Sequence, residues 1–129
     1  MKKNRRVFIL LIVSLFLFVN SYSQQKEIPP AADRAAKLTE WMKTNLELTA
    51  EQVAPVQEIN LKYANKMDDL RKSSQGRRQK MQTLKNDNKA KDAELKTILT
   101  ADQFKTYLAK KEEIKKKFKE EMKERKQAG

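Results

Sequence analysis

The chain lacks cysteine and histidine entirely, and it contains only two glycines and three prolines among 129 residues. Without cysteine there is no disulfide framework and no thiolate nucleophile, and without histidine there is no imidazole base or imidazole metal ligand. Two glycines cannot build a glycine-rich phosphate loop, and so few turn residues disfavour an all-β domain. We therefore expect an all-α protein that is not an enzyme, with no catalytic residues, no cofactor and no metal site.

The first 23 residues have the pattern of a secretory signal peptide. Four basic residues precede thirteen residues of which only Ser14 is polar, and the small residues Ser21 and Ser23 follow. Thirteen helical residues span about 20 Å, too little for a hydrocarbon core of about 30 Å. We expect cleavage after Ser23, export to the periplasm of a double-membrane cell and no stable membrane anchor afterwards, with residues 24–30 forming a polar leader.

Removal of residues 1–23 leaves 106 residues with a net charge of +8, of which only 17 are Leu, Ile, Val or Phe. A chain of this size with so few large apolar side chains cannot bury a deep core alone. We therefore expect its helices to share their apolar stripes with a second copy in a homodimer.

Two segments of the form Leu-Thr-x-x-Gln have the features of a helix N-terminus. The threonine suits the cap position, the glutamine can reach back to the N–H of that cap, and the leucine can pack one turn into the helix. We call these segments the two boxes and expect a helix to begin at each; their residues are Leu48, Thr49 and Gln52 in the first and Leu99, Thr100 and Gln103 in the second.

Apolar residues at three- and four-residue steps predict four helices, over residues 31–46, 50–73, 77–97 and 101–126. We expect them to form one helical domain over residues 31–126, a four-helix antiparallel hairpin with short connections. Asn60 is a polar break in the apolar stripe of the second helix. Pro55 lies inside that helix and predicts a kink or a restarted helix there.

Residues 71–91 carry eight basic side chains and one acidic side chain. Such a stretch attracts polyanions or negatively charged protein surfaces; the alternative interpretation is a solvated helix face that happens to be basic. Met67 and Leu70 precede this stretch, and their helical spacing favours packing in the core or at a dimer interface.

The two boxes, the export signal and the helical pattern together resemble the LTxxQ-motif family of Spy- and CpxP-like periplasmic proteins. The resemblance extends from about residue 31 to residue 126. It implies a four-helix homodimer shaped like a shallow cradle, whose basic concave face binds non-native proteins without ATP. Some relatives instead restrain envelope-stress sensor kinases. Others bind metals through histidine and similar ligands, and histidine is absent here.

The sequence thus predicts an ATP-independent periplasmic chaperone, a holdase, whose partners are unfolded or partly folded proteins. Methionine adapts to many surfaces, and long basic side chains add apolar cover. The alternative is an envelope-stress regulatory protein that binds one sensor partner. Export and scattered aromatic residues disfavour nucleic acid as a partner. The predicted client-binding residues are Arg71, Lys72, Arg77, Arg78, Lys80, Met81, Leu84 and Lys85.

Overall fold

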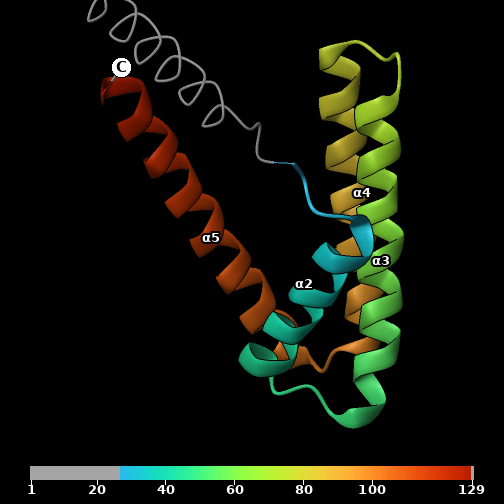
Figure 1. Cartoon of the computed structure of the whole chain (residues 1–129). Coiled ribbons are helices and arrows are strands. Elements are labelled where there is room, and N and C mark those ends of the chain that lie inside the picture. The colour runs from blue at the N-terminus through green and yellow to red at the C-terminus, as the bar shows by residue number, and fades with distance from the viewer. Residues whose placement is uncertain (1–26, 129) are drawn as a thin grey trace, which may run out of the picture.

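The computed structural model describes residues 27–128, and these form four α-helices joined by short turns (Figure 1). The described part contains no β-strand, so the predicted all-α class is confirmed. The expected signal peptide and residues 24–26 of the leader lie outside the described residues, and residues 27–30 have no regular secondary structure. Each predicted helix boundary agrees with the structure to within two residues; the helices are α2 (Ala31–Leu46), α3 (Ala50–Lys72), α4 (Arg77–Ile98) and α5 (Ala101–Ala128).

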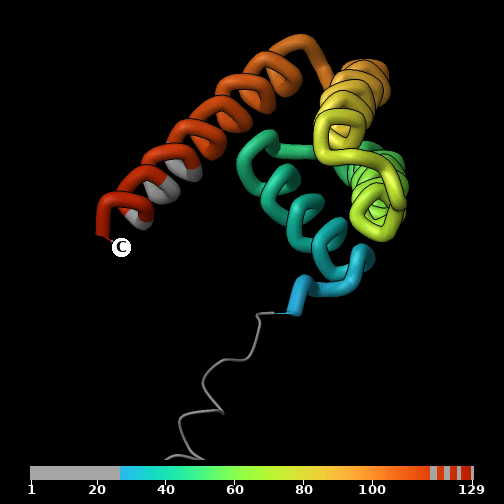
Figure 2. Tube along the Cα trace, turned by 90° about the horizontal axis from the view of Figure 1, so that it is seen from above, coloured from blue at the N-terminus to red at the C-terminus, as the bar shows by residue number. Residues whose placement is uncertain are grey.

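The helices form an open arrangement in which α3 and α4 are an antiparallel hairpin and α2 packs against α3 (Figure 1). The start of helix α5 packs against α2 and α4, and the helix then runs away from the hairpin. The view from above shows the same divergence, with α2 between the two arms (Figure 2). The molecule therefore has a closed end, where all four helices meet, and an open end.

The apolar core lies at the closed end. Met42, Val56 and Leu95 have no exposed surface, and each such side chain contributes about 1.5–3 kcal/mol to stability. Along the hairpin from residue 64 to residue 94, by contrast, no residue is buried. The closed end thus carries most of the packing energy; its buried cluster comprises Met42, Leu46, Val56, Ile59, Tyr63, Leu95, Leu99 and Tyr107.

The predicted polar break at Asn60 is buried inside this core, with an exposed fraction of 1%. Its Nδ2 donates a hydrogen bond to the Thr39 hydroxyl at 3.0 Å, and that hydroxyl donates to the Ala35 carbonyl at 2.8 Å. The Asn60 Oδ1 accepts no hydrogen bond from any residue that the structure describes. One half of this buried amide is therefore unsatisfied.

Of the two alternatives predicted at Pro55, a kink or a restarted helix, the restarted helix is wrong, because α3 continues through this residue without interruption. A proline here removes one backbone hydrogen bond, near the start of the helix. The next turn contains Val56 and Ile59, which are both buried in the core. Their packing holds the chain in helical conformation across the proline.

The two boxes lie side by side and are joined through their glutamines. Gln52 Nε2 donates to Gln103 Oε1 at 2.8 Å, and Gln103 Nε2 donates back to Gln52 Oε1 at 3.0 Å. Each Oε1 also accepts the backbone N–H of its own cap, from Thr49 at 3.0 Å and from Thr100 at 2.9 Å. Each glutamine therefore completes its own capping box and binds the other box; we call this pair the glutamine clasp.

The second N–H of each amide ties the clasp to the helix that precedes the other box. Gln52 Nε2 donates to the carbonyl of Ile98, at the end of α4, at 3.0 Å. Gln103 Nε2 donates to the carbonyl of Leu46, at the end of α2, at 3.2 Å. Helix ends leave such carbonyls without an intrahelical partner. The clasp thus satisfies two helix starts and two helix ends in one network.

Replacing either glutamine by alanine is expected to lower the free energy of unfolding by about 1–3 kcal/mol, because polar backbone groups lose their partners. The loss of unfolding free energy in the double variant should be about 1 kcal/mol smaller than the sum of the two single losses, because either single change already breaks the glutamine pair. Urea denaturation followed by circular dichroism measures both quantities. Gln79→Ala, at an exposed position of α4, should change stability by less than about 0.5 kcal/mol. Strict additivity of Gln52→Ala and Gln103→Ala would contradict the clasp.

Candidate functional site

A shallow groove with a volume of about 350 Å³ lies where α3 ends and α4 begins. Its apolar side chains are Met67 and Leu70 from α3 and Met81 and Leu84 from α4. Met81 is 58% exposed and Met67 is 37% exposed, so these side chains are not closed off by packing. We call this feature the distal groove, because it lies at the end of the hairpin away from the core.

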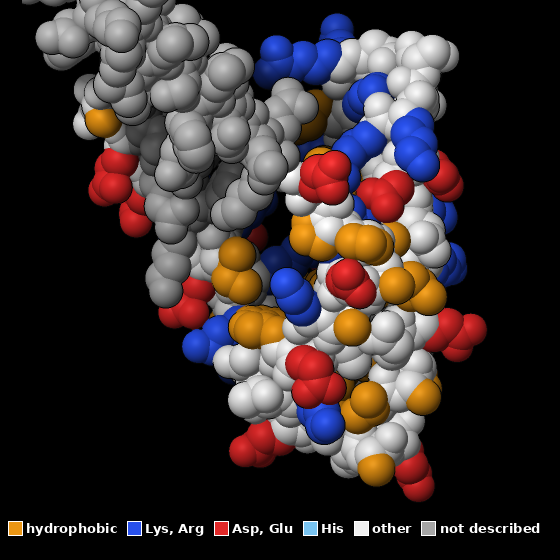
Figure 3. Space-filling model, viewed as in Figure 1, with side chains coloured by type: hydrophobic (Ala, Val, Ile, Leu, Met, Phe, Trp, Pro, Cys, Tyr) orange, Lys and Arg blue, Asp and Glu red, His pale blue; other side chains and the backbone are white. Residues whose placement is uncertain are grey.

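Basic side chains border the distal groove. Arg71, Arg77 and Lys80 line it together with Gln75, and no carboxylate of the described residues does so. Lys80 Nζ donates to the backbone carbonyl of Arg71 at 3.1 Å, which ties the first turn of α4 to the last turn of α3. Lys and Arg side chains gather visibly at this end of the hairpin (Figure 3). The groove therefore combines an apolar floor with a positive border.

Five of the eight predicted client-binding residues line this groove: Arg71, Arg77, Lys80, Met81 and Leu84. The other three, Lys72, Arg78 and Lys85, are exposed but do not line it.

Met67 and Leu70 were expected in a core or an interface, but within this chain they line the distal groove. They continue the stripe of α3 past Tyr63, the last buried residue of that helix. The facing part of α4 offers only two large apolar residues, so the stripe extends beyond the core. This difference in apolar content between α3 and the facing part of α4 is the sequence feature that indicates an exposed position for Met67 and Leu70.

A second cavity, of about 160 Å³, lies between α2, α3 and α4. It shares Met67 and Leu84 with the distal groove, so the two spaces lie next to each other along the hairpin. Asn60, with its unsatisfied Oδ1, also lines this cavity. We call it the seam cavity; sequence analysis missed it, because its lining comes from three helices.

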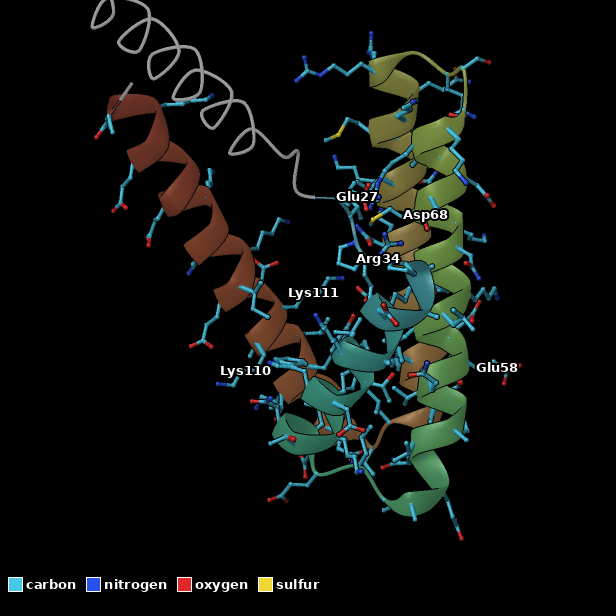
Figure 4. The ribbon with its side chains drawn as sticks, viewed as in Figure 1. Glu27, Arg34, Glu58, Asp68, Lys110 and Lys111 are labelled. Atoms are coloured by element: carbon cyan, nitrogen blue, oxygen red, sulfur yellow. The ribbon has the colours of Figure 1, made fainter. Side chains whose placement is uncertain are left out.

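Most charged groups around the seam cavity are already paired. Arg34 Nη2 donates to Asp68 Oδ1 at 2.7 Å and to the Ala64 carbonyl at 3.0 Å, and the view with side chains shows Arg34 and Asp68 close together (Figure 4). The hydrogen bond from Arg34 holds the pKa of Asp68 below its ordinary value. Asp87 forms an ion pair with Lys66 at 3.6 Å.

Lys91 is the exception among these charges. It lines the seam cavity from α4 and forms no ion pair with any side chain in the described part of the chain. Burial, and next the positive charge of Lys111, lowers the pKa of Lys91 from 10.5 to about 8, although Asp92 opposes this shift. Lys91 is therefore a cavity-lining residue without an ion-pair partner among the described side chains.

Two carboxylates of α4 hold the neighbouring helices. Glu94 accepts hydrogen bonds from Lys62 at 2.6 Å and from the Tyr63 hydroxyl at 2.8 Å, both on α3. Burial and this bond raise the pKa of Tyr63 to about 12. These contacts fix α4 against α3 beside the core.

Asp92 makes the corresponding connection to α5. It accepts hydrogen bonds from the Tyr107 hydroxyl at 3.0 Å and from Lys111 Nζ at 2.9 Å. Lys111 extends from α5 toward the hairpin (Figure 4). Burial, and next the charge of Asp92, raises the pKa of Tyr107. The tie lies in the first three turns of α5, and beyond them the helix runs away from the hairpin (Figure 1).

Within residues 27–128 no cluster of three or more acidic side chains is placed to hold a metal ion. None of the described helices is both long enough and apolar enough to cross a bilayer.

Fold and site define an all-α protein in which a capped helical hairpin presents an apolar groove with a basic border. A family described as a domain of unknown function (DUF4890) matches residues 20–107, and the chain belongs to this family. The matched range includes both boxes, the distal groove and the seam cavity. No curated protein and no solved structure matches the chain.

The lowered pKa of Lys91 predicts a pH dependence of stability with a definite sign. Between pH 8 and 10 the unfolded chain binds more protons at this residue than the folded chain, so the free energy of unfolding rises with pH. Above pH 10 the folded chain binds more protons at Tyr63 and Tyr107 than the unfolded chain, because both pKa values are raised. These two residues therefore lower the free energy of unfolding as the pH rises further. Urea denaturation between pH 8 and 10 should show a rise of about 1–2 kcal/mol that is lost in Lys91→Met.

Lys89→Met is the matched control, because this neighbouring lysine is exposed and should leave the rise in place. The same slope in wild type and Lys91→Met would show that Lys91 is not the group responsible.

Proposed function

We propose that this protein is an exported, ATP-independent holdase that binds unfolded or partly folded proteins at the distal groove. The observation that carries the proposal is the exposed apolar floor bordered by Arg71, Arg77 and Lys80. The resemblance of the two boxes to LTxxQ-motif proteins supports it, as does the signal-like sequence of the first 23 residues. The protein acts by binding and carries out no reaction.

The chemistry of the groove suits many different clients. Methionine is flexible and polarizable, so Met67 and Met81 can fit side chains of different shapes. A positive border speeds the encounter with acidic, partly unfolded chains, an effect that salt screens. The hairpin end has no buried residue, and such regions open at low cost in free energy. An adaptable surface is what a binder of many sequences needs.

Dimerisation is part of the proposal. Helix α5 carries Leu108 and Ile114 with exposed fractions of 39% and 54%, on an arm that, among the described residues, packs against the other helices near its start. A second copy that covers this face would supply the apolar burial that the single chain lacks.

Suppression of aggregation tests the function directly. Light scattering of a reduced model client should fall in the presence of a several-fold excess of the mature protein at low salt, without nucleotide. Suppression should weaken as the salt concentration rises, because the encounter is electrostatic. No suppression at low salt would reject the proposal.

Two matched pairs of variants locate the site. Arg77→Glu should weaken suppression several-fold more than Arg78→Glu, because the two changes are chemically identical and only Arg77 lines the groove. Met81→Ser should likewise weaken suppression more than Ile28→Ser, since both side chains are exposed to a similar extent, 58% and 57%, and only Met81 lines the groove. Equal effects within each pair would place the site elsewhere.

A further inference from the structure

The distal groove and the seam cavity are neighbours, and together they suggest a composite site. Met67 and Leu84 line both spaces, so a guest whose apolar group occupies the groove can place its next residues at the cavity. The groove is bordered by cations at one end of this path, and the cavity holds Lys91 at the other. The path therefore has an apolar part and a polar part.

Lys91 is the group in the cavity that lacks a counter-ion. Arg34 is bound by Asp68 and by a backbone carbonyl, and the Asp87 carboxylate is paired with Lys66. A buried charge without a partner is costly, and an entering carboxylate would remove that cost. Cavities of roughly 150 Å³ hold guests the size of benzene, and this one, at about 160 Å³, accommodates the end of an acidic side chain.

The positive charges along these two spaces favour an acidic guest. Arg71, Arg77 and Lys80 border the distal groove, and Lys91 lines the seam cavity. Under the proposed function the guest is a polypeptide segment, whose side chains supply both an apolar group and a carboxylate. A fatty acid also carries an apolar chain and a carboxylate, and the experiment below distinguishes it.

The geometry points to a two-part recognition site that takes polypeptide segments in which apolar side chains are followed by a glutamate or aspartate, with the apolar group in the distal groove and the carboxylate on Lys91. Leu84 and Lys91 are seven residues apart on α4, which is about 10 Å along the helix axis. An extended guest covers that distance in about three residues. This inference rests on the proposed function and specifies which client segments bind.

Calorimetry with three short peptides tests the inference on the full mature protein. The peptides contain two leucines, then two serines, then glutamate, glutamine or lysine. The glutamate peptide should bind about tenfold more tightly than the glutamine peptide, and the lysine peptide most weakly. Lys91→Met should lower the affinity for the glutamate peptide to that for the glutamine peptide. Lys91→Arg and the exposed control Lys89→Met should keep the preference for the glutamate peptide.

Proton uptake gives an independent readout. At pH 8 about half of the Lys91 side chains are neutral, and an entering carboxylate would recharge them. Titrations in two buffers of different ionisation enthalpy should show uptake of up to about half a proton with the glutamate peptide, and none in Lys91→Met. Thermal unfolding of each variant verifies that it is folded.

The results of these experiments distinguish the two-part recognition site from the holdase function. Equal binding of the glutamate and glutamine peptides, or a preference that survives Lys91→Met, overturns the inference, and the holdase proposal stands if aggregation is still suppressed. A preference for glutamate without suppression overturns the holdase proposal and keeps the two-part site. Displacement of the glutamate peptide by equimolar decanoate would assign the path to a lipid anion, and it would overturn the assignment to polypeptide.

Discussion

The glutamine clasp is the contact on which the arrangement of the four helices depends. Gln52 and Gln103 satisfy each other, their own cap residues and the carbonyls at the ends of α2 and α4. Four helix termini therefore meet at one point, where unpaired backbone groups would otherwise be left half-buried. The boxes occur twice because each glutamine completes the network of the other.

The scarcity of large apolar residues explains where the exposed apolar surface lies. The chain gathers those it has around Met42, Val56 and Leu95 at the clasped end, and the distant half of the hairpin is held by polar links such as the one from Lys80 to the Arg71 carbonyl. Apolar side chains in that half cannot be covered by this chain. These apolar side chains remain exposed beside basic residues. They contribute little packing energy, and they form a surface suited to binding.

The seam cavity joins these two regions. Its walls include Asn60, which belongs to the core, and Met67, which belongs to the distal groove. Asn60, the polar break in the stripe of α3, and Lys91 thus line the space next to the exposed methionines. A holdase with such a composite site would sort its clients by chemistry as well as by exposed apolar area, and this gives selectivity to a surface that otherwise accepts many shapes.

Local chemistry in the sequence determined the helices and their boundaries. Threonine caps with returning glutamines define where α3 and α5 begin, and apolar spacing marks the face of each helix that turns inward. Only the tertiary structure decided that the two glutamines bind each other and that α3 remains continuous at Pro55. It also separated Arg77, which borders the groove, from Arg78, which does not, and placed Lys91 in the cavity. The reason is that capping depends on residues three or four positions apart, whereas these other features depend on how helices distant in sequence are rotated against one another.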